Sequence, residues 1–130
     1  MTLTVTLLAA AAAAFLNVWL GSRIAALRGI HKVSVGDGGN EALLRRMRAQ
    51  ANYVENAPFF LILLGALELS SASRLILAGA AVIFLAARVS HALGMDADAD
   101  RRLRMFGMIG QTLSLLGLAI YAAVVAIVSF

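Results

Sequence analysis

The sequence predicts an all-α fold, in which four antiparallel helices form an integral membrane bundle. Apolar residues make up 62% of the 130 residues and charged residues only 14%, whereas roughly a quarter of the residues in a soluble domain are charged. The apolar residues gather in four segments, each long enough for a helix through a bilayer. Short links join these segments, so neighbouring helices run in opposite directions. We expect residues 1–130 to form a single domain.

Polar turns separate the four helices. We expect the helices at about residues 2–27, 41–69, 74–93 and 101–129. The first has no basic residue before its apolar run, which is typical of a retained span rather than of a cleaved leader. The link SVGDGGN carries three glycines and ends at Asn40, a candidate N-cap for the second helix. ELSSASR supplies serines that can cap the third helix, and GMDADAD forms an acidic link before the fourth.

Basic residues predict the orientation of the bundle. With four antiparallel helices, ten of the eleven Lys and Arg residues lie at the end that holds the first and third links, and only Arg74 lies at the other end. We expect a multi-pass protein of the cell (inner) membrane. The positive-inside rule places the basic end of its bundle on the cytoplasmic side. Because these charges flank apolar spans, we expect no nucleic acid partner. The absence of cysteine and the presence of only two histidines argue against a metal site.

The second helix carries charged side chains where a span should be apolar. Arg45, Arg48, Asn52 and Glu55 are three or four residues apart, which places them on one stripe of a helix. The apolar run that follows, up to Glu68, covers about 20 Å, whereas the hydrocarbon core of a bilayer is about 30 Å thick. Such polar groups cost several kcal/mol when they face lipid. We therefore expect the stripe to turn inward and line a polar cavity.

Two further features support such a cavity. Arg88 and His91, three residues apart, form a similar stripe on the third helix. Pro58 lacks an N–H for the helix ladder, so it leaves a carbonyl near Val54 free and favours a local bend.

Other interpretations of these residues remain open. Arg46 is interpreted as an anchor at the membrane interface. Arg48 and Glu55 could form a structural ion pair, and a lone histidine such as His91 is often a satisfied core residue. The convergence of several charged residues at one depth favours a binding site over these alternatives.

At these residues the sequence resembles the MAPEG family, the membrane-associated proteins in eicosanoid and glutathione metabolism. The segment RMRAQANYVENAP is similar to the signature of the family's second helix, at Arg48, Ala49, Gln50, Asn52, Glu55 and Pro58. The resemblance continues through RGIHKVSVGDGG, through RVSHALG and through Leu103–Arg104, so it covers nearly the whole chain.

The resemblance implies a homotrimer of four-helix subunits that binds glutathione, as a co-substrate, at each subunit interface near the cytoplasmic side. The positions that match glutathione-contacting residues are Arg28, Arg48, Asn52, Glu55, Arg88 and His91, and Arg104 matches the arginine that activates the glutathione sulfur. The sequence departs from the eicosanoid-synthesising relatives at Met95, where they have a tyrosine, and at Met105, where they have a serine. These departures favour a general detoxifying transferase or peroxidase.

The chemistry of glutathione agrees with these residue types. Arginines suit its two carboxylates, a glutamate suits its ammonium and an amide suits its peptide groups. We expect Arg28, Arg48 and Arg88 to bind the carboxylates, Glu55 the ammonium and Asn52 the peptide. The thiolate that Arg104 stabilises would then attack a lipophilic electrophile or lipid hydroperoxide arriving from the bilayer.

Two other function classes are compatible with the sequence. A non-catalytic module of the same fold would hold a lipid between subunits. A transport bundle would use the inward charges as an ion path, but PFFLILLGAL in the second helix offers no acid or base to complete such a path.

Overall fold

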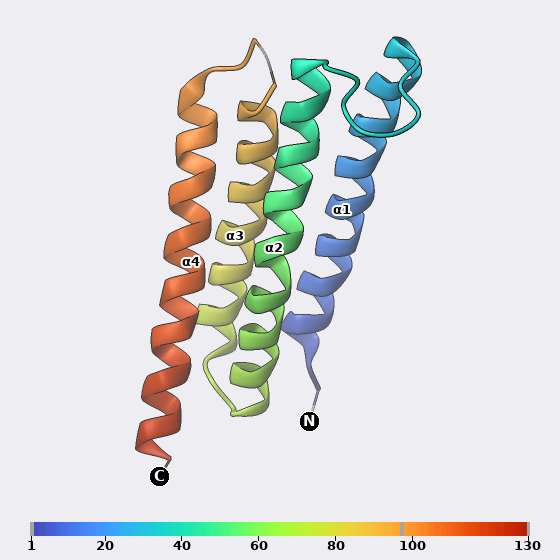
Figure 1. The fold of residues 1–130 in the computed structure, drawn as a ribbon. Coiled ribbons are helices and arrows are strands. Elements are labelled where there is room, and N and C mark those ends of the chain that lie inside the picture. Colours follow the sequence, from blue (N-terminus) through green and yellow to red (C-terminus); the bar gives the residue numbers. More distant parts are fainter. Residues whose placement is uncertain (1, 97, 130) are drawn as a thin grey trace.

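The computed structural model describes residues 2–96 and 98–129, and these form a bundle of four long helices. The helices are α1 (Thr4–His31), α2 (Glu41–Leu69), α3 (Arg74–Gly94) and α4 (Arg101–Val128). Consecutive helices run antiparallel, so α1 begins and α4 ends at the same end of the bundle (Figure 1). The predicted all-α fold with four helices is confirmed.

The ends of the helices follow local capping chemistry. The side chain of Asn40 accepts a hydrogen bond from the backbone N–H of Leu43 at 2.9 Å and caps α2 as predicted. Asp100 caps α4 in the same way. Ser73 precedes α3 but makes no capping bond with its side chain, so the expected serine cap of this helix is wrong. Helix α1 also continues one turn beyond the predicted end, to His31.

Three of the helices are suited to a membrane. Within the described residues, α1, α3 and α4 are long and apolar enough to cross a bilayer, which fits a multi-pass integral membrane protein. Helix α2 has a similar length of 29 residues, but its first half is polar. Large apolar side chains are exposed around the bundle, among them Phe15, Leu75 and Leu113. Such a surface requires lipid or other subunits as its neighbours.

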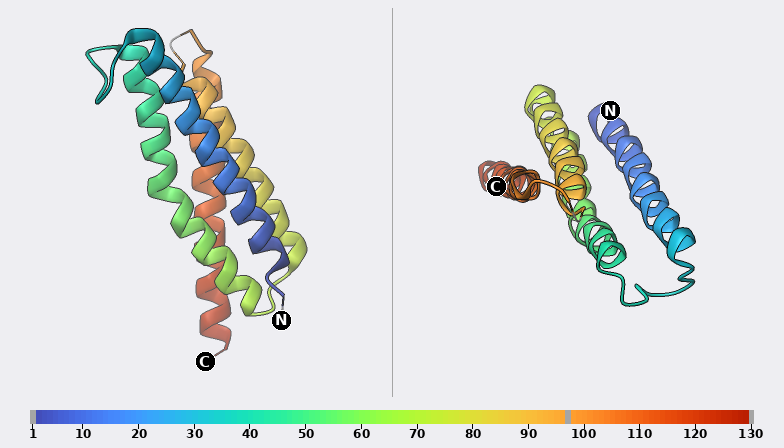
Figure 2. Two further views of the ribbon diagram at one scale, coloured as in Figure 1. Left: turned by 90° about the vertical axis from the view of Figure 1, so that its right-hand side faces the viewer. Right: turned by 90° about the horizontal axis from the view of Figure 1, so that it is seen from above.

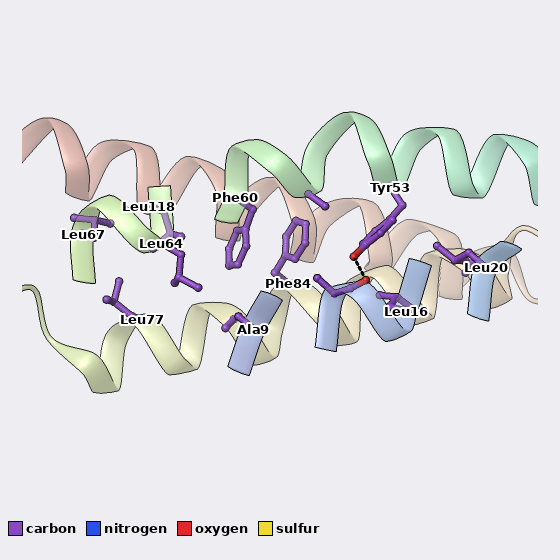
Figure 3. Close-up of a cluster of buried hydrophobic side chains, with 14 residues drawn as sticks. Ala9, Leu16, Leu20, Tyr53, Phe60, Leu64, Leu67, Leu77, Phe84 and Leu118 are labelled. Carbon is purple, nitrogen blue, oxygen red and sulfur yellow. Dashed lines mark hydrogen bonds between the residues drawn. The ribbon is translucent and has the colours of Figure 1, made fainter. Parts of the chain in front are cut away.

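The apolar core lies between α1, α2 and α3 and reaches α4 at Leu118. Phe60 and Phe84 stack with their ring centroids 4.0 Å apart (Figure 3). At the edge of this core, the hydroxyl of Tyr53 donates a hydrogen bond of 2.6 Å to the backbone carbonyl of Ala13. This bond ties α2 to α1 and satisfies a buried phenol.

The outer helices lie on opposite sides of the α2–α3 pair, as the view from above shows (Figure 2). Helix α4 packs mainly against α3, and among the described residues it makes no contact with α1. Glycines allow α4 to approach α3 closely, because an added Cβ at Gly110 would come within 2.8 Å of the Cβ of Ala87. The closely packed α3 and α4 line the pocket described next, together with α2.

Candidate functional site

A pocket of about 350 Å³ lies between α2, α3 and α4, near the α3–α4 link. Eight residues line it: Arg48, Ala51, Asn52 and Glu55 from α2, His91 from α3, Met95 directly after α3, and Arg104 and Met108 from α4. Five of the seven predicted site residues thus meet in one hollow. Three of the five polar lining residues come from α2, and two methionines are among the residues that line the pocket from outside α2.

Helix α2 presents one charged stripe to this pocket. Of the predicted stripe, Arg48, Asn52 and Glu55 line the pocket. Arg45 does not line it and instead lines a neighbouring hollow. The ion pairs of the described residues do not include one between Arg48 and Glu55, so the alternative of a structural pair is wrong. Both charges are therefore available to a ligand.

Asn52 has an unsatisfied acceptor at the pocket. Its backbone carbonyl accepts a hydrogen bond of 2.8 Å from the side chain of Asn56. Its side-chain oxygen Oδ1 is buried and has no hydrogen-bond partner among the described residues. Buried amide oxygens are rarely left in this state, and each one calls for a donor that the chain itself does not supply.

Arg88 lies behind the pocket rather than in its lining. Its side chain is 1% exposed, which makes it the largest of the fully buried side chains. The guanidinium donates a hydrogen bond to the side-chain oxygen of Gln111 on α4, and its Nη2 lies 3.2 Å from Nδ1 of His91. Arg88 therefore reaches the pocket through His91. Its bond to Gln111 was not predicted from the sequence.

Arg28 lies on a different side of α2. It lines a separate hollow of about 600 Å³ between α1 and α2, together with Gln50. Gln50 follows Arg48 by two positions, which places the two side chains on nearly opposite faces of α2. The guanidinium of Arg28 donates to the carbonyl of Gly36 at 3.3 Å, and its buried Nε has no hydrogen-bond partner among the described residues. Within one chain, Arg28 is not brought to the pocket of Arg48.

An ion cluster that was not predicted from the sequence lies at the same end of the bundle. Asp96 pairs with Arg23 at 2.5 Å and with Arg46 at 3.1 Å. Arg46 also donates to the backbone carbonyl of Arg23, and Arg23 lies 4.8 Å from the centre of the Trp19 ring. Arg46 is therefore part of an interhelical ion cluster as well as a residue of the basic end. The cluster fixes the chain next to Met95, which lines the pocket.

Two comparisons with known proteins bear on the identity of the chain. No curated protein matches the sequence. The model of the MAPEG family matches residues 6–124, which is nearly the whole chain and includes every residue that lines the pocket. The resemblance found in the sequence is thereby confirmed, and the chain belongs to the MAPEG family.

Proposed function

We propose that the protein is a glutathione-dependent membrane transferase or peroxidase that acts on lipophilic electrophiles or lipid hydroperoxides. Membership of the MAPEG family supports this, since the family includes transferases and peroxidases of that kind. The observation that carries the proposal is the pocket in which Arg48, Glu55 and Arg104 meet without an ion pair between Arg48 and Glu55. Two cations and one carboxylate complement a small thiol peptide that carries two carboxylates and an ammonium.

The binding roles follow from charge and from hydrogen-bonding capacity. Glu55 accepts from the ammonium of glutathione, and Arg48 binds one of its carboxylates. The unpartnered Oδ1 of Asn52 accepts from a peptide N–H. Glutathione therefore provides a partner for each of these three side chains.

Arg104 is the proposed catalytic residue. The pKa of a free thiol is near 8.5, and a neighbouring guanidinium in a partly enclosed site can lower it by about two units. The thiolate sulfur then forms a bond to the electrophilic carbon, and the leaving group departs with the bonding electrons. Met95 and Met108 offer an apolar, adaptable wall to the second substrate, which reaches the site from the bilayer.

Arg28 completes the site only if it comes from another subunit. Because it lies on the opposite side of α2 from the pocket, the proposal places the α1–α2 face of one protomer against the pocket of the next. A homotrimer repeats this contact three times around a closed ring. Arg88 acts in this scheme through His91. In this proposal the basic end of the bundle lies on the cytoplasmic side of the inner membrane.

Conjugation of glutathione to a chlorinated nitrobenzene by the purified, detergent-solubilised protein tests the proposal. At pH 7 the Arg104→Ala variant should lose about 25-fold in kcat/KM, because a thiol with a pKa near 6.5 is about three-quarters ionised and one with a pKa near 8.5 only about 3%. Arg101→Ala removes a neighbouring arginine of α4 that does not line the pocket, and it should retain its activity. Absence of turnover by the wild-type protein, or full activity of Arg104→Ala, would contradict the assignment.

A second candidate is a non-catalytic module that binds lipid. It is favoured by an apolar groove of about 490 Å³ between α3 and α4, in which Gly79 and Gly117 have no atom within 4 Å of an added Cβ. Isothermal calorimetry separates the two functions. Binding of lipid without any binding of glutathione would favour the module.

A further inference from the structure

Three buried polar side chains connect α3 and α4 behind the pocket. Arg88, His91 and Gln111 are 1%, 4% and 5% exposed, and they form a chain of hydrogen bonds from Gln111 through Arg88 to His91. Only His91 lines the pocket. The roles assigned so far to glutathione binding and thiol activation make no use of Gln111. A buried polar network of this kind rigidifies the side chains within it.

The glycines of α4 bring this chain of bonds together. An added Cβ at Gly107 would lie 2.5 Å from the Cβ of His91 and 2.6 Å from the carbonyl oxygen of Ala87. Helix α4 can therefore approach α3 closely only because no side chain stands at this position. Gln111 follows Gly107 by one helical turn on the same face, and so its amide reaches Arg88.

The direction of each hydrogen bond is fixed by the donors. A guanidinium has five N–H donors and no acceptor. The oxygen Oε1 of Gln111 must accept from Arg88, and Nδ1 of His91 must also accept. An imidazole that accepts at Nδ1 and is neutral carries its proton on Nε2. His91 can then donate an N–H from its other nitrogen.

We propose that Gln111 is a positioning residue that acts through Arg88 and holds His91 as the neutral tautomer with its proton on Nε2. His91 then presents one fixed N–H donor to the pocket, where it binds an acceptor oxygen of glutathione. The part that concerns glutathione rests on the proposed function, but the tautomer does not.

The charge balance of the network agrees with this role. Within the part of the chain that the structure describes, no carboxylate pairs with Arg88, and its Nε has no hydrogen-bond partner. Its two partners, the amide oxygen of Gln111 and Nδ1 of His91, bring no negative charge to it. A second positive charge on His91 would face this uncompensated guanidinium, so the neutral ring is favoured.

Nitrogen-15 NMR of histidine-labelled protein in micelles, without glutathione, reads the tautomer directly. The chain has only two histidines, and the exposed His31 serves as an internal reference. In the wild type, His91 should show a protonated Nε2 and an unprotonated Nδ1. In Gln111→Leu, which removes the acceptor for Arg88, this single tautomer should give way to a mixture. Gln111→Glu keeps an acceptor oxygen and should restore it.

Kinetics provide the second measurement. Gln111→Leu should raise the KM for glutathione about tenfold, as expected for a weakened hydrogen bond. Its effect on kcat should be smaller. Gln111→Glu should reverse most of the change in KM. Ser114→Ala is the control, because the hydroxyl of Ser114 bonds only to Gly110 within its own helix. A wild-type His91 with its proton on Nδ1, or an unchanged tautomer and KM in Gln111→Leu, would overturn the proposal. A wild-type protein that is inactive but carries the proton of His91 on Nε2 would support the positioning role of Gln111. The same result would contradict the proposed function.

Discussion

Gly107 of α4 lies directly against His91 of α3, so that a Cβ at position 107 would come within 2.5 Å of both the Cβ and the backbone nitrogen of His91. Real Cβ atoms do not approach backbone atoms so closely. The hydrogen atom that serves as the side chain of Gly107 therefore sets the distance between the two helices. The wall of the pocket formed by His91 and Arg104 depends on this contact.

Gly107→Ala should destabilise the protein by about 1–3 kcal/mol, the usual cost of overpacking. The neighbours of the new methyl group are the Cβ and backbone nitrogen of His91 and the backbone oxygen of Ala87, which cannot move without shifting α3. The melting temperature of the purified protein in detergent measures the effect. Gly117→Ala on the same helix is the control. Among the residues that the structure describes, an added Cβ at Gly117 would meet no neighbouring atom within 4 Å. Because alanine favours a helix over glycine, this control should be neutral or stabilising. Equal melting temperatures for the two variants would refute the close contact.

Glu68→Gln should weaken the start of α1. The carboxylate of Glu68, at the end of α2, accepts hydrogen bonds from the backbone N–H groups of Val5 and Thr6 at 2.9 and 2.8 Å and from the hydroxyl of Thr6 at 2.7 Å. A negative charge at a helix N-terminus also interacts favourably with the helix dipole. Hydrogen exchange of the first turn of α1 should become faster in this variant. The control Glu41→Gln, at an exposed carboxylate, should leave that exchange unchanged.

Asp96→Asn should destabilise the basic end of the bundle. The carboxylate neutralises both Arg23 and Arg46, whose side chains are only 12% and 25% exposed. The variant should lose about 1–2 kcal/mol of stability, between the values for exposed and for buried pairs. Asp98→Asn alters an exposed acid of the same link and serves as the control. A larger fall in melting temperature for Asp98→Asn would contradict the cluster.

The positions of the helices could be predicted from the sequence because the relevant forces are local. Apolar runs, glycine-rich turns and the cap at Asn40 all act within a few residues of the chain. The stripe of Arg48, Asn52 and Glu55 was predictable for the same reason, since helical spacing alone decides which residues share a face. Helix α1 runs beyond its predicted end at residue 27, because the charged residue Arg28 and the residues after it keep the helical backbone up to His31.

Contacts between helices could not be predicted in this way. Arg88 and His91 share a stripe in the sequence, yet one is buried behind the pocket and the other lines it. Which of them reaches the cavity depends on how closely α4 approaches, and this depends on Gly107. The bond of Gln111 to Arg88 likewise spans two helices, and no spacing rule connects the two positions.

Glu55→Gln should weaken glutathione binding by about tenfold or more, because a hydrogen bond between charged groups is lost. A glutathione analogue without the amino group isolates the cause. The wild type should bind this analogue more weakly than glutathione, whereas Glu55→Gln should bind the two about equally. Calorimetry on the four combinations yields the coupling energy. If the variant still distinguished glutathione from its analogue as well as the wild type does, Glu55 would not be the partner of the ammonium.

Mixed trimers test whether two subunits build each site. Neither Arg28→Ala nor Arg104→Ala alone should be active as a homotrimer. If Arg28 and Arg104 of one site belong to neighbouring protomers, a trimer that contains both variants has an interface at which both arginines are intact.

The two variants, carrying different affinity tags, are co-expressed and purified through both tags in sequence. We expect the mixed trimers to regain part of the wild-type conjugation rate, whereas variants purified separately and then combined in detergent without exchange should stay inactive. If both arginines came from the same protomer, no mixture could contain a complete site, and the doubly tagged protein would be as inactive as its parents.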